Sequence, residues 1–263
     1  MNDLLAHTRD DRGVHRLTLN DAARFNVLGD AMLAALSEAV TRIAADEGAR
    51  ALVIAARGKA FCAGHDLREM AAQDKAQHLD LFERCSRFMV SLARLPVPVI
   101  AAVQGVAAAA GCQLVAQCDL AIAANGTRFG VNGIDIGLFC GTPSVALLRN
   151  VPHKAGMHML MTGDFVDAEA ALRLGLVSEV CAPEGLDAAV EALLLKLLAR
   201  PREALAMGKA LVAQQRTLGL EAAYALASRT MAENLALPVT QEGVRAFVDK
   251  RAPNWRVSPA DPV

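Results

Sequence analysis

The order of hydrophobic patterns along the chain predicts an α/β fold followed by an all-helical C-terminal segment. Short apolar runs, typical of parallel strands covered on both faces, alternate with longer helical stretches over roughly the first 190 residues. From about Leu186 onward, only Ala- and Leu-rich helical sequence follows. We therefore predict a core over residues 1–190 and a helical segment over residues 191–263, which packs on the core and on neighbouring subunits.

The first half of the predicted core begins with a strand and a helix. The alternating run 14–19 predicts a half-buried strand, and apolar positions at helical spacing after Asp30 predict a helix to residue 46. The remaining elements of this half are a strand over 51–55, a loop over 57–66 and helical sequence to about residue 95.

The second half repeats this alternation and ends in helices. Its predicted elements are, in order, a strand over 97–103, a turn of small residues, a buried helix, a strand over 120–123, a loop over 137–143, a helix to residue 150, a helix from Asp167 to residue 173 and a strand over 177–180. Three helical stretches follow, one to residue 201, one over 202–236 and one over 240–250.

Composition excludes several classes of function. The formal net charge of −1 argues against a general nucleic-acid or membrane-surface binder. The N-terminal residues carry mixed charge, unlike a signal peptide, and polar residues interrupt the one long apolar stretch, 97–124, unlike a membrane span. The six cysteines form no C-x-x-C pair, and the histidines show no spacing typical of a metal site. We expect a soluble cytoplasmic protein with reduced thiols and no metal.

The segment Val106-Ala-Ala-Ala-Ala-Gly-Cys-Gln113 is the most informative part of the chain. It follows the strand over 97–103 and begins a buried helix, so free backbone N–H groups and the positive end of the helix dipole face whatever binds there. Small residues also allow close packing between elements, and the segment taken alone favours that simpler interpretation.

A second turn of small residues, Phe61-Cys-Ala-Gly-His-Asp-Leu67, follows the strand over 51–55. If neighbouring strands bring the two turns together, one N–H group from each can converge on a single oxygen. Such an oxyanion hole suits a carbonyl that gains negative charge, for example a thioester that becomes an enolate.

With these two turns, further motifs make the chain resemble the crotonase (enoyl-CoA hydratase/isomerase) superfamily nearly from end to end. The motifs are Arg24-Phe-Asn-Val-Leu28, Pro98-Val-Ile-Ala-Ala-Val-Gln-Gly105, Gly111-Cys-Gln-Leu-Val-Ala-Gln-Cys-Asp-Leu120, Thr162-Gly-Asp, Ala170-x-x-x-Gly-Leu-Val-Ser178 and Ala246-Phe-Val-Asp-Lys-Arg251. Each is weak alone, but their order and spacing are those of the family.

Within this family the chain looks most like one subgroup, the enoyl-CoA hydratase domain-containing protein 3 type. The likeness rests on Ala109-Ala-Gly-Cys-Gln-Leu-Val-Ala116 together with Gly137-Leu-Phe-Cys-Gly-Thr-Pro143. The subgroup implies no settled reaction.

The resemblance implies a crotonase-like ββα spiral core that binds an acyl-coenzyme A (CoA) thioester. It implies no cofactor beyond the CoA of the substrate, and a homotrimer or a dimer of trimers. The backbone N–H groups of His65 and Ala110 would form the oxyanion hole, and Phe247 and Lys250 would contact CoA, often in a neighbouring subunit. The residues that the resemblance assigns to substrate or CoA are Arg24, Ala63, Gly64, His65, Asp66, Leu67, Arg68, Gly111, Gly133, Phe247 and Lys250. The two arginines suit the phosphates of CoA.

Two positions depart from the hydratases of this family, which hold and activate a water molecule with two glutamates. Gln113 stands at the first of these positions and Gly133 at the second. An amide can donate or accept a hydrogen bond but cannot transfer a proton, and glycine has no side chain to do either. The sequence therefore predicts that ordinary hydration of enoyl-CoA is weak or absent.

Other side chains are candidates for the missing chemistry, each with a simpler alternative. Cys140 can act as a nucleophile or weak acid, or be a small buried apolar group. Asp135 can carry an acid into the pocket, or be a turn or surface carboxylate. We expect Gln113 to orient water or substrate. The His65 side chain can contact a ligand, although the fold needs only its N–H group, and we expect Asp66 to fix its own loop.

Two functions fit these features. The first is an enzyme, a lyase or an isomerase, that works through a thioester enolate. The second is a protein that binds acyl-CoA without catalysis. A purely structural scaffold fits less well, because it gives no reason to keep both turns.

Overall fold

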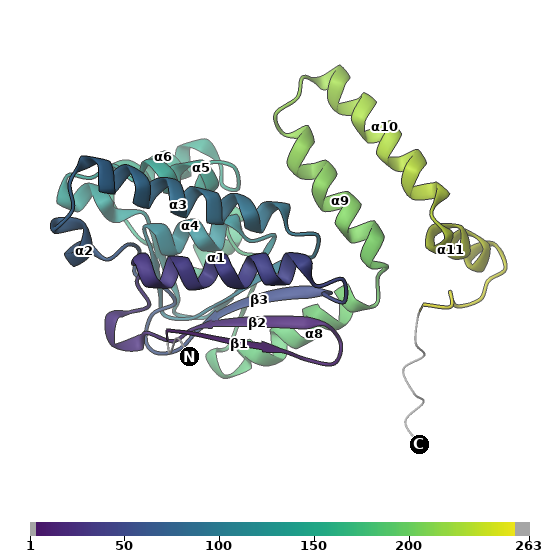
Figure 1. Ribbon diagram of the computed structural model, residues 1–263, viewed down its shortest axis with the longest axis horizontal. Coiled ribbons are helices and arrows are strands. Elements are labelled where there is room, and N and C mark those ends of the chain that lie inside the picture. Colours follow the sequence, from purple (N-terminus) through teal and green to yellow (C-terminus); the bar gives the residue numbers. More distant parts are fainter. Residues whose placement is uncertain (1–3, 256–263) are drawn as a thin grey trace.

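A six-stranded sheet in the order β1-β2-β3-β4-β6-β9 forms the centre of the computed structural model, which describes residues 4–255 (Figure 1). Its strands are β1 Leu5–Arg9, β2 Val14–Leu19, β3 Ala51–Ala56, β4 Val99–Val103, β6 Leu120–Ala124 and β9 Glu179–Cys181. Every neighbouring pair is parallel except β1 with β2. The carboxyl ends of the parallel strands therefore meet at one edge of the sheet.

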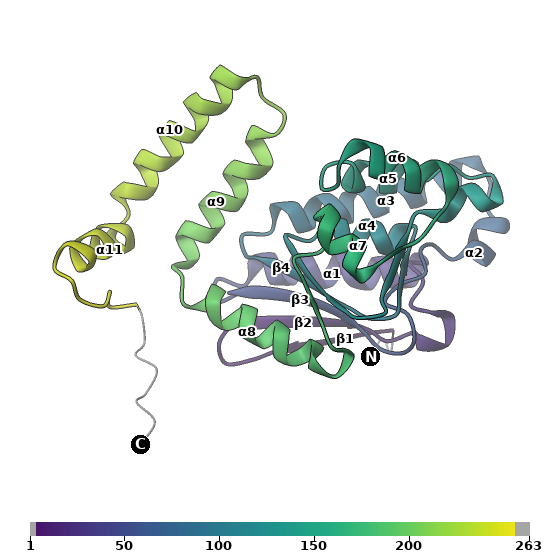
Figure 2. The same ribbon diagram turned by 180° about the vertical axis from the view of Figure 1, so that it is seen from behind.

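Helices cover both faces of this sheet, as the apolar strand sequences predict. Along β3, Leu52 and Ile54 belong to the larger hydrophobic core cluster, whereas Ala51 and Val53 belong to a second cluster on the opposite face. On the first face lie α1 Asp30–Ala45, α3 Lys75–Arg94 and α4 Ala110–Gln117, and α8 Leu186–Leu198 covers the second (Figures 1 and 2).

A smaller sheet stands beside the first at the carboxyl ends of its strands. It contains β5 Val106–Ala108, β7 Arg128–Gly130 and β8 Val166–Asp167 in the order β5-β7-β8. The remaining helices of the core are α2 Leu67–Ala71, α5 Gly141–Leu147, α6 His153–Thr162 and α7 Ala168–Leu174. Asp167 caps α7, as predicted, by accepting a hydrogen bond from the N–H of Ala170 at 2.7 Å.

The structure differs from the predicted elements where short strands and caps decide the local geometry. Strand β1, the three short strands of the second sheet and helix α6 were not predicted. The helical sequence before residue 95 is divided into α2 and α3. The division occurs because Asp74 and Gln77 form a reciprocal capping box, which starts a new helix at Lys75.

Three helices leave the core as a C-terminal arm (residues 199–255; Figures 1 and 2). They are α9 Arg202–Gln215, α10 Leu220–Ala236 and α11 Pro238–Val248. The predicted boundary at residue 190 falls inside α8, whose Val190 and Leu194 are buried against the sheet. The core therefore extends through Leu198, and the stretch predicted over 202–236 is two helices joined at Gly219.

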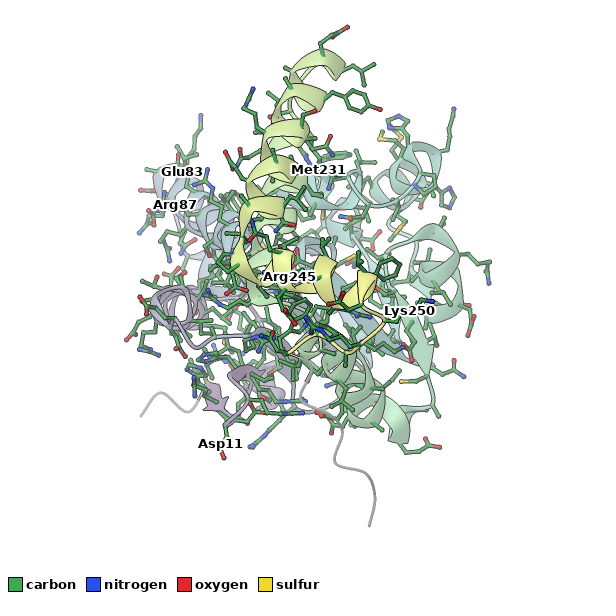
Figure 3. The ribbon with its side chains drawn as sticks, turned by 90° about the vertical axis from the view of Figure 1, so that its right-hand side faces the viewer. Asp11, Glu83, Arg87, Met231, Arg245 and Lys250 are labelled. Carbon is green, nitrogen blue, oxygen red and sulfur yellow. The ribbon has the colours of Figure 1, made fainter. Side chains whose placement is uncertain are left out.

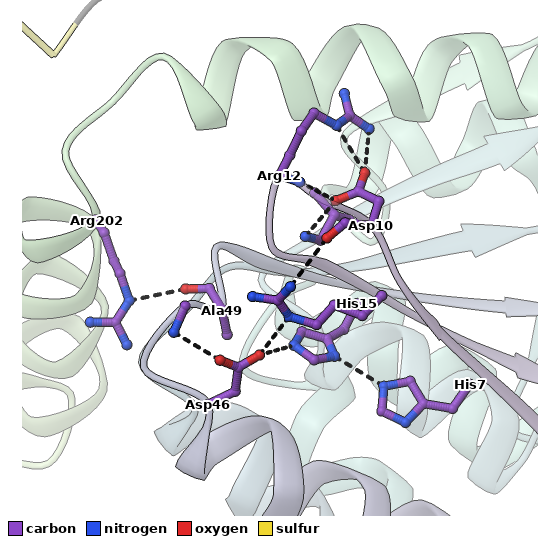
Figure 4. Close-up of polar contacts among 10 residues, drawn as sticks. His7, Asp10, Arg12, His15, Asp46, Ala49 and Arg202 are labelled. Carbon is purple, nitrogen blue, oxygen red and sulfur yellow. Dashed lines mark hydrogen bonds and ion pairs between the residues drawn. The ribbon is translucent and has the colours of Figure 1, made fainter.

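Backbone carbonyls at the sheet edge hold the base of the arm. The Arg202 guanidinium donates to the carbonyl of Ala49 at 3.0 Å, next to a partly buried chain of contacts in which His15 meets both Asp46 and His7 (Figure 4). Arg50 donates to two carbonyls at the end of α8. These bonds fix where the arm begins.

Lys209 is the deepest attachment of the arm. Its ammonium group donates to the carbonyls of Leu92 at 2.9 Å and Val97 at 3.0 Å, and pairs with the carboxylate of Asp119 at 2.6 Å. Only 11% of the Lys209 side chain is exposed. Burial lowers the pKa of Lys209, and the nearby Asp119 opposes this effect. Asp119 thus serves as an ion-pair residue, and it also accepts a hydrogen bond from the N–H of Val99 at the start of β4.

Beyond this attachment the arm exposes apolar side chains. No residue of α10 is buried, and Leu220, Tyr224 and Met231 are among its exposed large apolar groups (Figure 3). An exposed apolar face of this kind is typical of an interaction surface. Within residues 4–255, no helix combines the length and apolar character needed to cross a membrane.

The Lys209→Met substitution should lower the free energy of unfolding by about 2–4 kcal/mol, because it leaves a half-buried carboxylate and two carbonyls without their donor. Urea unfolding followed by circular dichroism measures this. The matched control is Lys196→Met on α8, an exposed lysine. Equal stability of the two variants would show that the Lys209 contacts do not hold the arm.

Candidate active site

A cavity of about 320 Å³ opens where α2, the start of α4 and the segment 132–143 meet. Its wall is mostly apolar. The residues that line it are Ala63, His65, Leu67, Met70, Phe82, Ala109, Ala110, Asn132, Gly133, Ile136, Leu138, Phe139, Cys140, Gly141, Thr142 and Pro143. Both predicted small-residue turns contribute to this wall.

The two turns are joined by backbone hydrogen bonds. The N–H of Cys62 donates to the carbonyl of Val106 at 3.1 Å, and the N–H of Ala108 donates to the carbonyl of Cys62 at 2.9 Å. A Cβ atom on Gly111 would lie only 2.1 Å from the Cys62 carbonyl oxygen. Only glycine at position 111 therefore allows the turns to approach this closely.

The close approach of the two turns brings the backbone at His65 close to the backbone at Ala110. A Cβ on Gly64 would lie 3.5 Å from the backbone nitrogen of Ala110. Ala110 is the first residue of α4, so its N–H has no partner within the helix. The N–H of His65 donates to no backbone or side-chain acceptor in residues 4–255. The predicted pair of free donors is thus held on adjacent turns.

Ala109 adopts an unusual backbone conformation that sets the direction in which α4 begins. Its φ of 49° lies in the left-handed region, which costs energy for any residue other than glycine. Two hydrogen bonds hold it there: its N–H donates to the carbonyl of Gly130 at 2.8 Å, and its carbonyl accepts from the N–H of Gln113 at 3.0 Å. The second sheet therefore fixes the direction of the Ala110 N–H.

The segment from Arg24 to Leu28 supports the other turn. The N–H of Ala63 donates to the carbonyl of Phe25 at 3.0 Å, and the N–H of Leu28 donates to the carbonyl of Gly64 at 2.7 Å. This explains why the motif accompanies the site although most of it lies outside the cavity wall.

Asp66 fixes its own loop, as the sequence predicts. Its carboxylate caps α2 by accepting from the N–H of Arg68 at 2.9 Å, and it accepts from the Arg24 guanidinium at 3.2 Å. Arg24 also pairs with Asp21, so both of its carboxylate partners compete with a phosphate. Arg68 lies exposed on the first turn of α2. Of the two arginines, Arg68 is therefore the better placed for a phosphate.

Gly133 and Cys140 share one small space in the cavity wall. The N–H of Gly133 donates to the Cys140 sulfur at 3.3 Å. A Cβ at position 133 would lie 2.8 Å from that sulfur and 2.4 Å from the carbonyl oxygen of Leu138. The thiol and the loop backbone occupy the place where a glutamate side chain would begin. Burial raises the pKa of Cys140, so its thiol stays protonated near neutral pH.

Neither Gln113 nor Asp135 is among the residues that line the cavity. Gln113 is 4% exposed on α4, and its amide oxygen has no hydrogen-bond partner within residues 4–255. Asp135 is exposed, and its carboxylate points toward Gly163 and the amide of Asn132, outside the cavity wall. The structure does not bring Asp135 to the site, because the short helix that carries it turns the side chain toward the end of α6.

Phe247 and Lys250 also lie away from the cavity of their own chain. Phe247 is 85% exposed on α11, and Lys250 follows at the end of that helix (Figure 3). The arm carries both to the side of the molecule opposite α2 (Figures 1 and 2). Neither residue lines the cavity of its own chain.

The sequence did not single out most of the apolar wall. Met70 and Phe82 enter from α2 and α3, and Ile136, Leu138 and Phe139 lie in the loop opposite. The apolar run at 136–139 inside a predicted loop was the available signal. Among the described residues, the titratable side chains of the wall are His65 and Cys140, and the wall contains no carboxylate.

The model of the enoyl-CoA hydratase/isomerase family matches residues 9–258. The chain belongs to this family. Enoyl-CoA hydratase domain-containing protein 3, mitochondrial, from Mus musculus is 42% identical over 252 residues, which are 95% of this chain and 84% of that protein. The predicted family and the likeness to this subgroup are confirmed. Family members are named for hydration or isomerisation of enoyl-CoA thioesters.

Solved structures of family members confirm the predicted fold. An enoyl-CoA hydratase from Mycobacterium smegmatis is 55% identical, with a TM-score of 0.94 over 96% of this chain and 98% of that one. Human enoyl-CoA hydratase domain-containing protein 3 is 39% identical, with a TM-score of 0.92 over 96% of this chain and 100% of that one. The crotonase-like core and the C-terminal helices are therefore those of the family.

The Gly133→Ala substitution should lower the free energy of unfolding by about 1–3 kcal/mol, because the new methyl group meets the Leu138 carbonyl and the Cys140 thiol. Gly141→Ala is the matched control, since it adds a methyl group to another cavity glycine that has nothing within 4 Å. Chemical unfolding of both variants measures and compares their free energies of unfolding. A Gly133→Ala variant as stable as the control would show that the space at position 133 is free.

Proposed function

We propose that this protein binds a CoA thioester with its acyl group in the cavity and stabilises the enolate form of the thioester. The two N–H groups of His65 and Ala110 are the donors for the thioester oxygen. The observation that carries the proposal is the hydrogen-bonded contact between the two turns, which holds both donors beside the cavity. Fixed backbone donors suit developing negative charge because they need no rearrangement during the reaction.

The position of the CoA part of the substrate follows from the position of these two donors. We propose that the segment 63–67 borders the path of the pantetheine and adenine groups, with Gly111 and Gly133 beside the thioester. Arg68, with Arg24 after release from its carboxylates, meets the phosphates. Phe247 and Lys250 belong to the site of a neighbouring copy in a homotrimer or a dimer of trimers. The exposed apolar face of the arm supports this assembly.

The reaction that the site supports best is transfer of a proton between carbon atoms of the acyl group. Hydration needs two groups that position and activate water, whereas a shift of a double bond needs one group that takes and returns a proton. The wall contains no carboxylate among the described residues, and Gln113 can orient a ligand but cannot carry a proton. We therefore propose an isomerase-type activity with weak hydration. The runner-up is binding of acyl-CoA without catalysis, which the same lack of carboxylates favours.

The protein should exchange the α-protons of 3-butenoyl-CoA for deuterium in D₂O and hydrate crotonyl-CoA slowly or not at all. Gly111→Ala should lower the exchange rate by about 10²–10³-fold, because separating the turns removes one donor from the oxyanion hole. Mass spectrometry of the recovered thioester measures the exchange.

Gly208→Ala on α9 is the control for that experiment, since its methyl group enters open space outside the site. Rapid hydration of crotonyl-CoA would contradict the assignment of Gln113 and Gly133. Binding of 3-butenoyl-CoA without exchange would favour the non-catalytic alternative.

Cys140→Ser tests whether the thiol takes part in the chemistry. A serine hydroxyl can also accept the hydrogen bond from Gly133, so the fold should persist. If the thiol only fills space, exchange with 3-butenoyl-CoA stays within about threefold of the unaltered protein. If the thiol donates or accepts a proton, exchange should fall by about 10²-fold or more.

A further inference from the structure

The imidazole ring of His65 is a chemical group in the cavity wall that the oxyanion hole does not use. The hole needs only the backbone N–H of this residue. The ring lies beside Phe82, also in the wall, with ring centres 5.6 Å apart in an edge-to-face arrangement. A partly buried ring at this place therefore calls for its own explanation.

Hydrogen bonding decides which ring nitrogen carries the proton. The Nδ1 atom lies 3.0 Å from the carbonyl oxygen of Leu28. A carbonyl oxygen can only accept, so Nδ1 carries the hydrogen and Nε2 of the neutral ring holds a free lone pair. Within residues 4–255, this Nε2 atom is buried and has no hydrogen-bond partner. An unpartnered buried acceptor costs stability unless a ligand contacts it.

The surroundings keep the ring in its basic form. Burial is the main cause that lowers the pKa of His65, and the positive charge of Arg84 adds to it, while the contact with Leu28 opposes it. The ring is therefore unprotonated at neutral pH. Cys140, the other titratable group of the wall, stays a protonated thiol. His65 is thus the group of the wall that is ready to accept a proton.

We propose that the imidazole of His65 is the base that removes the α-proton of the bound thioester. The inference rests on the proposed function, because it needs the thioester oxygen to lie in the oxyanion hole. One residue then supplies both a donor to that oxygen and, a few bonds away, the acceptor for the proton. Asp135 lies outside the wall, and the amide of Gln113 is not a base.

The step balances without any further reactant. The Nε2 lone pair forms a bond to the α-hydrogen, and the electrons of the broken C–H bond form the carbon–carbon double bond of the enolate. The thioester oxygen receives the electrons of its own double bond and is held by the two N–H groups. For 3-butenoyl-CoA, the imidazolium then returns the proton to the γ-carbon. The product is crotonyl-CoA, and the ring is neutral again.

The test compares His65→Gln with the unaltered protein in the rate at which each exchanges the α-protons of 3-butenoyl-CoA for deuterium in D₂O. Glutamine keeps the backbone N–H and an amide donor for the Leu28 carbonyl, so the fold and ligand binding should persist, but it has no basic nitrogen. Exchange and conversion to crotonyl-CoA should both fall by at least about 10²-fold, as expected for loss of a general base. In the unaltered protein the rate should fall as the pH drops through an apparent pKa below 6.5, the ordinary value for histidine.

His78→Gln is the matched control. His78 also directs a ring nitrogen to a backbone carbonyl, that of Met70 at 2.8 Å, but does not line the cavity. Its exchange rate should equal that of the unaltered protein. His65→Ala provides a second variant that also keeps the N–H group, and binding of 3-butenoyl-CoA by calorimetry verifies that each site is intact.

Two results separate the possible failures. If His65→Gln or His65→Ala binds the thioester and exchanges it at the unaltered rate, the ring is not the base, and the proposed function still stands. If the unaltered protein binds the thioester without exchanging its α-protons, the proposed enolate function is wrong, and the proposed role of His65 is wrong as well.

Discussion

The rest of the site depends on the backbone contact between the turn at Cys62 and the turn at Ala108. Two hydrogen bonds join these turns, and Gly111 is required because any side chain there would collide with the Cys62 carbonyl. The contact sets the spacing of the N–H groups of His65 and Ala110. The strained conformation of Ala109, held by Gly130 of the second sheet, then sets the direction of the Ala110 N–H. Position in the fold, and not side-chain identity, thus creates the binding half of the site.

In the proposed function backbone groups hold the thioester, so the side chains around it are free to differ. Gln113 keeps the shape but not the proton-transfer ability of a glutamate, and the Cys140 thiol fills the space next to Gly133. The wall is left with an imidazole as its ready base. On this proposal, recognition of the thioester is separate from the choice of reaction, and one fold can therefore carry different reactions.

The sequence was sufficient for features that depend on local composition. The small-residue turns, the apolar strands and the cap at Asp167 were predictable because glycine, β-branched residues and capping residues have direct backbone consequences. Features that depend on long-range packing were not. The direction of Asp135, the entry of Phe82 into the wall and the burial of Val190 against the sheet depend on how distant segments meet.

The most direct test of the oxyanion hole is the infrared carbonyl frequency of bound butyryl-CoA labelled with ¹³C at the thioester carbon. Two hydrogen bonds from His65 and Ala110 withdraw electrons from this carbonyl, so its stretching frequency should be lower in the complex than for the free thioester in water. The shift should disappear in Gly111→Ala. A bound thioester with the frequency found in water would contradict the account, because the two N–H groups would then not hold its oxygen.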